Sequence, residues 1–85
     1  MLKVGDHVIY TDPTRKDHAA LVTTIWTQDM INVLFVSSDE AKQDQYGRQI
    51  ERETSVGRYS ENNCHGRCFR DLGVEAAFKE HPAAA

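Results

Sequence analysis

The stretch Ala19–Val36, AALVTTIWTQDMINVLFV, decides the fold that the sequence predicts. Its two apolar halves, 19–26 and 31–36, are rich in β-branched residues, which lose side-chain freedom in a helix and fit a pleated sheet. The short polar segment 27–30 between them is typical of a hairpin turn. We therefore expect a β-hairpin. Because residues 31–36 are apolar at nearly every position, we expect the second strand to be central, and either covered on both faces or strongly bent.

One further strand is predicted before this hairpin, and another late in the chain. Residues 7–10, HVIY, follow the turn signal Gly5-Asp6, and they place Val8 and Tyr10 on one face. Residues 66–70 are predicted to form a short last strand. We expect Cys68 to point inward, whereas the sequence does not decide on which face of the strand Phe69 lies.

A fifth strand is predicted over residues 48–56, whose polar positions alternate. The alternation places Gln49, Glu51 and Glu53 on one face, which we expect to meet solvent on a charged edge strand. Five short strands joined by turns predict a small barrel or a strongly bent sheet. The Gly5-Asp6 turn ahead of the first strand is similar to that of SH3-like barrels, so we expect a mainly β fold, a small SH3-like five-stranded barrel over residues 1–72.

Two segments depart from the strand pattern. Residues 37–47 are polar, and a loop of this length in a small domain is usually functional or mobile; a short helical turn from Ser38 is the alternative. Residues 73–81 contain helix formers with Phe78 on the apolar face, and Pro82 ends them. The sequence thus predicts a short C-terminal helix and tail over 73–85.

Composition restricts the classes of function. The 85 residues predict one domain, and 13 acidic against 10 basic side chains give a net charge of -3, which argues against a nucleic-acid ligand. No apolar run is long enough for a membrane helix, and the first residues lack the pattern of a secretory signal. We expect the chain in a cytoplasm or in a particle assembled there.

The segment Cys64-His65-Gly66-Arg67-Cys68 is the one place where chemically reactive side chains gather. A structural zinc site normally needs two paired ligand clusters, and the sequence supplies one. Neighbouring residues of a strand point to opposite faces, so Cys64 and His65 are badly placed for a nucleophile and its base. We predict no catalytic residue, no metal and no cofactor. Cys64 and Cys68 are four residues apart across a glycine and could approach disulfide distance in a turn, but in a reducing compartment we expect two free thiols.

Aromatic and basic side chains late in the chain are the candidates for contact with a partner. The tyrosines lie in polar loops, where aromatic rings often mark interfaces. The three arginines form either a small basic patch or local ion pairs. The predicted partner-binding residues are Tyr46, Tyr59, Arg58, Arg67, Arg70 and Phe78.

The order of several short patches resembles a group of small, mostly uncharacterised SH3-like barrel proteins of tailed bacteriophages. The matching patches over residues 4–70 are VGDHVIY, HAALVTTIW, INVLFV, ETSV and a final glycine-aromatic strand, here GRCFR. The chain departs from the group at Gly57, where a proline is usual, and at Cys68, Phe69 and Arg70, where tryptophans are usual. The resemblance implies a phage origin and an SH3-like barrel, and it carries over no catalytic residue.

These observations favour a non-enzymatic module that binds other protein subunits. With the resemblance, they lead us to expect a virion structural protein that decorates or stabilises a capsid, as a homo-oligomer or bound to the particle. The alternative is a host-takeover or anti-defence factor. Such a factor would bind a host protein, or a small anionic nucleotide near Arg58, Arg67 and Arg70. An enzyme is the disfavoured third reading.

Overall fold

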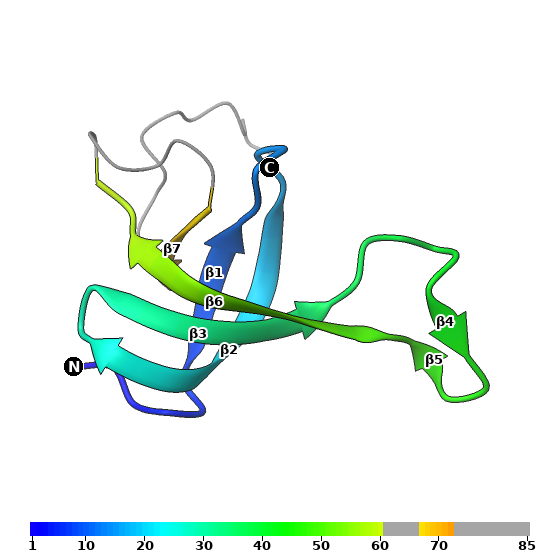
Figure 1. Cartoon of the computed structure of the whole chain (residues 1–85), viewed down its shortest axis with the longest axis horizontal. Coiled ribbons are helices and arrows are strands. Elements are labelled where there is room, and N and C mark those ends of the chain that lie inside the picture. Colours follow the sequence, from blue (N-terminus) through cyan, green and yellow to red (C-terminus); the bar gives the residue numbers. More distant parts are fainter. Residues whose placement is uncertain (61–66, 73–85) are drawn as a thin grey trace.

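The computed structural model describes residues 1–60 and 67–72 as a closed five-stranded barrel (Figure 1). The strands follow the order β1-β2-β3-β6-β7, with antiparallel neighbours except β6 and β7, which pair in parallel. Their bounds are β1 His7–Thr11, β2 Asp17–Thr27, β3 Met30–Val36, β6 Ile50–Arg58 and β7 Cys68–Asp71. The prediction of a mainly β, five-stranded barrel is confirmed.

The described part of the chain contains no helix, and accordingly none that is long and apolar enough to cross a membrane. The helix predicted over 73–81 lies outside the described residues.

The central hairpin forms where the sequence predicts it. Strands β2 and β3 pair through a two-residue turn at Gln28 and Asp29, and the Asp29 N–H donates to the Thr27 hydroxyl at 3.1 Å. Two register shifts interrupt the pairing, one between Val22 and Thr24 and the other between Ile25 and Thr27. Bulges of this kind bend and twist a strand, so the hairpin can curve around the core.

The core is built from the inward-facing residues of all five strands. Val8, Val22, Val33, Phe35 and Val56 are buried, while Ile25 is only half-buried at the edge of the core. The complete buried hydrophobic cluster is Val8, Tyr10, Ala20, Val22, Ile31, Val33, Phe35, Val56 and Phe69.

Strand β7 buries Cys68, as predicted, and also Phe69, whose side the sequence left open. Phe69 pairs with Tyr10 and belongs to the core cluster, whereas Cys68 pairs with Thr11 on the opposite face and is buried outside that cluster. Cys68 is disulfide-bonded, so the expectation of a free thiol is wrong for this residue. Cys64 and His65 lie outside the described residues.

Asn32 is a polar residue inside the apolar run of β3, and its amide oxygen supports a bulge. The pairing of β3 with β6 slips between Ile31 and Val33, and Ser55 on β6 takes a left-handed conformation with φ of 55°. The Ser55 N–H donates to Asn32 Oδ1 at 3.0 Å, and Trp26 Nε1 donates to the same oxygen at 2.9 Å. Asn32 therefore satisfies a backbone donor that the bulge diverts from the regular ladder.

Glu51 and Glu53 do not form the solvent-facing side of an edge strand, as the alternation suggested. They pair with Phe35 and Val33, and paired residues of neighbouring strands share a face. Both glutamates are half-buried on the core side of β6, which lies between β3 and β7. Their charge is compensated there, because the Ser37 hydroxyl donates to Glu51 and Arg67 forms an ion pair with Glu53 at 2.7 Å.

Residues 38–49, here called the arm, project from the barrel between β3 and β6 (Figure 1). The expected polar loop contains a small hairpin of β4 Gln43–Asp44 and β5 Gly47–Arg48. Gly47 has φ of 114°, a conformation that side chains disfavour. In place of the helical turn considered at Ser38, a single turn is closed by the Lys42 N–H on the Asp39 carbonyl at 2.9 Å.

Replacing Phe35 by alanine tests the core. Its ring contacts those of Tyr10 and His18, with centroids 4.9 Å and 4.6 Å away, and the side chain is 6% exposed. We expect Phe35→Ala to cost about 3–5 kcal/mol in denaturant unfolding, through lost burial and a cavity. Met30→Ala, at a 41% exposed residue of the same strand, is the control and should cost about 1 kcal/mol or less. Equal costs would place Phe35 outside the core.

Candidate functional site

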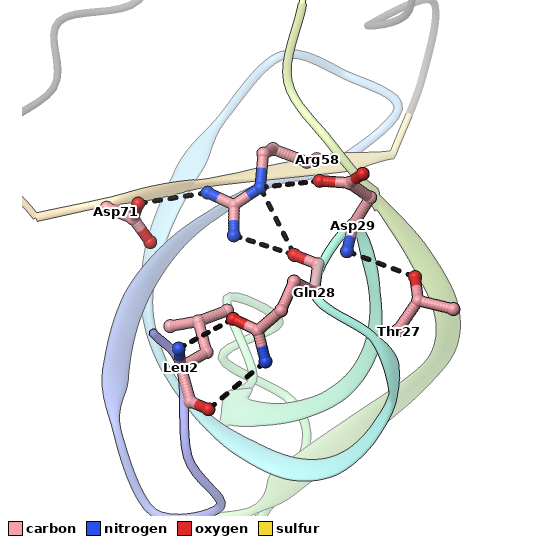
Figure 2. A network of polar contacts seen from close by, with 6 residues as sticks. All are labelled: Leu2, Thr27, Gln28, Asp29, Arg58 and Asp71. Carbon is pink, nitrogen blue, oxygen red and sulfur yellow. Dashed lines mark hydrogen bonds and ion pairs between the residues drawn. The ribbon is translucent and has the colours of Figure 1, made fainter.

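Arg58 lies at the centre of a polar cluster at one end of the barrel (Figure 2). Its Nε and Nη2 donate to the Gln28 carbonyl at 3.2 Å and 2.7 Å. Nε also donates to Asp29 at 3.0 Å, and Nη1 donates to Asp71 at 2.9 Å. The guanidinium carbon lies 4.8 Å from the centre of the Phe69 ring, within the range of a cation–π contact. One side chain of β6 thus contacts the β2–β3 turn and β7.

The Gln28 side chain extends this cluster to the N-terminal segment. Gln28 Oε1 accepts the Leu2 N–H at 2.7 Å, and Gln28 Nε2 donates to the Leu2 carbonyl at 3.3 Å (Figure 2). The amide therefore holds the segment before β1 as a neighbouring strand would, through one donor and one acceptor.

An open pocket of about 590 Å³ lies beside the cluster. Its volume falls in the range of small-molecule sites, about 300–1,000 Å³. Its walls include Leu2, Asp6, His7, Gln28, Arg58 and Asp71. Asp29 and Asp71 already form ion pairs with Arg58, so an anionic ligand would have to compete with two carboxylates for this guanidinium.

The other two candidate arginines form ion pairs of their own. Arg70 on β7 donates to Asp17 on β2 at 2.8 Å and to the Thr11 hydroxyl on β1 at 3.3 Å. Arg67, just before β7, forms its ion pair with Glu53 on β6. Each of the three arginines therefore joins separate strands through at least one carboxylate. The sequence left open whether the three arginines form a basic patch or local ion pairs, and in the structure they form local ion pairs.

Asp12 organises the connection between β1 and β2. Its Oδ1 accepts the N–H groups of Thr14 and Lys16, both at 2.9 Å, and the Thr14 hydroxyl at 2.7 Å, while Oδ2 lies 2.8 Å from His18 Nε2. Burial by itself would raise the pKa of Asp12, but the hydrogen bonds from His18, Lys16 and Thr14 favour the charged form. Together they lower the pKa from 3.8 to about 2.

His18 connects this carboxylate to the core. Its ring stacks on that of Tyr10 at a centroid distance of 5.8 Å and packs against Phe35. Burial, followed by the negative charge of Glu53, raises the pKa of Tyr10 to about 12. A tyrosine with an ordinary pKa of about 10 is already a neutral phenol at physiological pH, and this environment extends the neutral form to more alkaline pH.

The arm is the most exposed part of the described chain. Every residue from Ser38 to Ile50 is exposed, and Tyr46 at the hairpin tip is 87% exposed. The base of the arm is nevertheless bonded, because Arg48 donates to the Ser37 carbonyl and the Ser37 N–H donates to the Gln49 carbonyl, both at 2.9 Å. The arm presents an aromatic ring on a hydrogen-bonded base.

The remaining candidates lie elsewhere. Tyr59 is half-buried directly after β6, where its N–H donates to the Phe69 carbonyl at 2.7 Å. Phe78 lies outside the described residues. Tyr46 and Tyr59 consequently belong to different parts of the molecule, the arm and the closing strands.

An exposed apolar surface on the outside of β2, β3 and β6 was missed as a candidate site. Leu21 pairs with Leu34, and Val36 pairs with Ile50, so these side chains alternate with the core residues and face outward. Three of them are about half exposed: Leu21 at 44%, Val36 at 53% and Ile50 at 53%. We call Leu21, Leu34, Val36 and Ile50 the outer patch. The run INVLFV could have indicated this surface, because it is apolar on both faces of the strand. One face enters the core, and no described segment covers the other.

Among the described residues, no three histidine, cysteine, aspartate or glutamate side chains gather as a metal site. No family model, no curated protein and no solved structure matches this chain. The candidate functional surface therefore rests on its geometry, which points to the outer patch and the arm.

Arg58→Lys tests the closing cluster while the charge is kept. A single ammonium cannot bond to the Gln28 carbonyl, Asp29 and Asp71 in the planar arrangement of a guanidinium. We expect the free energy of unfolding to fall by about 2 kcal/mol. Arg67→Lys is the control, because Arg67 is 41% exposed and bonds to one carboxylate, so its cost should be about 0–1 kcal/mol. Equal costs in urea unfolding would contradict the special role of Arg58.

Asp12→Asn should make stability less dependent on pH. The carboxylate contributes its stability fully above the pKa of the unfolded chain, about 4, and loses it as pH falls through the folded pKa of about 2. We expect the variant to be less stable at pH 7 by about 1–2 kcal/mol. The difference should close between pH 4 and pH 2, which urea midpoints of both proteins measure. A constant difference over that interval would contradict this account.

Proposed function

We propose that this chain is a non-enzymatic protein-interaction module that binds other subunits through its outer patch and its arm. The observation that carries the proposal is the exposure of both elements: an apolar strip on β2, β3 and β6 that continues directly into a bonded, fully exposed hairpin. Contiguous exposed apolar surface on a small domain commonly marks an interaction site.

The arm supports the proposal energetically. Fixing the backbone of one residue costs about 1–2 kcal/mol, and the exposed arm buries little surface within its own chain. A partner that covers Tyr46 and pairs the nearby charges would offset this cost. Tyrosine is enriched in interfaces because its large rigid ring buries area while its hydroxyl still bonds.

The particular assembly that we propose is a phage capsid, which the chain would decorate or stabilise. Support comes from the resemblance of residues 4–70 to SH3-like barrel proteins of tailed phages, and the SH3-like assignment of this barrel is part of the same proposal. A net charge of -3 fits a protein that binds other proteins beside packaged nucleic acid without competing for it.

A soluble host-takeover factor is the second candidate. The same outer patch and arm could bind a host protein. The form of this candidate that sequesters an anionic nucleotide is weaker, because Arg58, Arg67 and Arg70 are each ion-paired with carboxylates of the chain itself.

Mass spectrometry of purified phage particles distinguishes the two candidates. A capsid component should be present at high copy number after the particles have been washed and banded. Absence of the chain from particles, together with its presence in the infected-cell extract, would contradict the capsid role and favour the soluble factor.

Tyr46→Ala should weaken binding to particles that lack the chain without changing the melting of the barrel. Loss of a buried interface tyrosine commonly costs about 2 kcal/mol or more, equivalent to a roughly thirtyfold rise in the dissociation constant. Tyr46→Phe keeps the ring and is the matched control, which should retain most of the affinity. Unchanged binding by Tyr46→Ala would remove the arm tip from the proposed interface.

A further inference from the structure

We propose that two copies of the chain associate face to face through the outer patch, with the arm of each copy lying against the barrel of the other. This inference deepens the proposed interaction role by naming the first partner as a second copy of the same chain. It rests on the shape of the exposed surface and on the charges around it.

The outer patch forms one half of the interface. The pairs Leu21–Leu34 and Val36–Ile50 place four aliphatic side chains side by side on three neighbouring strands. The second pair lies at the base of the arm, because Ile50 follows the arm directly and Val36 lies two residues before it. Patch and arm therefore form one continuous surface. An aliphatic strip can pack against the same strip of a second copy about a two-fold axis, as in an isologous dimer.

The arm forms the other half. Figure 1 shows β4 and β5 displaced from the barrel along the direction in which β3 ends and β6 begins. Neither strand pairs with a barrel strand, and Tyr46 is exposed at the tip. Four aliphatic side chains by themselves fall well short of the roughly 800 Å² per partner of a standard interface. An arm that reaches around the second copy supplies the missing contact.

The charges are complementary between the two halves. Arg52 pairs with Leu34 on the outward face of β6, beside the patch, and no described residue forms an ion pair with it. In the arm, Lys42 is directed to Glu51 of its own chain at 3.6 Å, and Arg48 to a backbone carbonyl.

Two acidic residues of the arm, by contrast, have no basic side chain as a partner among the described residues. Glu40 and Asp44 form no ion pair within the described part of the chain. An unpaired arginine beside the patch and unpaired carboxylates on the arm match each other between copies, since the arm projects away from the barrel that carries its own Arg52 (Figure 1). A foreign partner would need to supply both an apolar strip and both charge signs, which a second copy carries already.

Sedimentation velocity of the full chain over about 1–200 µM tests the proposal. We expect a species of twice the 9.6 kDa chain mass. Ile50→Glu should leave the chain monomeric while thermal melting stays cooperative. Val4→Glu, which adds the same charge at a 64% exposed apolar residue in the turn before β1, should leave the dimer intact. If Ile50→Glu fails to fold, the milder Ile50→Ser carries the same test.

A charge exchange tests the arm. Arg52→Glu and Glu40→Arg should each raise the dimer dissociation constant about tenfold. Glu40 is used because the Asp44 carboxylate accepts the Tyr46 N–H at 2.8 Å and so supports the arm hairpin. The double variant should return it to within about threefold of the original value. Failure of this rescue overturns the contact between arm and barrel.

A wild-type chain that stays monomeric throughout, or a dimer that Ile50→Glu and Ile50→Ser leave intact, overturns the proposal as a whole. These measurements need no other partner. A monomer that still binds particles therefore contradicts this inference and leaves the proposed function standing.

Discussion

The barrel depends on how the Arg58 guanidinium completes the closure between β6 and β7. These two strands pair in parallel through Gly57–Cys68 and Arg58–Phe69, a short ladder for the joint that closes a ring. Arg58 adds bonds to the β2–β3 turn and to Asp71, and its cation lies over the Phe69 ring. A planar group with five donors can join three chain segments at one point, which a ladder of two residue pairs cannot do.

Side chains also bond to backbone groups at other points where the regular ladder of the strands is interrupted. Asn32 accepts the N–H that the β6 bulge diverts, Asp12 accepts two N–H groups of the β1–β2 connection, and Gln28 bonds to both backbone groups of Leu2. A small barrel bends its strands sharply, and each bend leaves polar backbone groups to satisfy. The three arginines that looked functional in the sequence are also engaged within the chain, by carboxylates, so we place the proposed partner surface on the outer patch and the arm.

The hairpin and the barrel class could be predicted because their causes are local. β-branched runs, the Gly5 turn and the polar 27–30 segment act within a few residues of the chain. The orientation of Glu51 and Glu53 could not be predicted, because alternation reveals two faces without naming the inner one. Their pairing with Phe35 and Val33 decides it, and that pairing includes a bulge that shifts the register.

The sequence by itself determined the number of barrel strands, the central hairpin and most of the apolar residues that fill the core, since these follow from side-chain shape and spacing along the chain. Only the tertiary structure decided that the three arginines form ion pairs between separate segments of the barrel. Their carboxylates lie 13 to 53 positions away, and no local pattern records such a separation. Barrel closure likewise decided which apolar face of residues 31–36 enters the core and which is left outside, because a strand that is apolar on both sides carries no preference of its own.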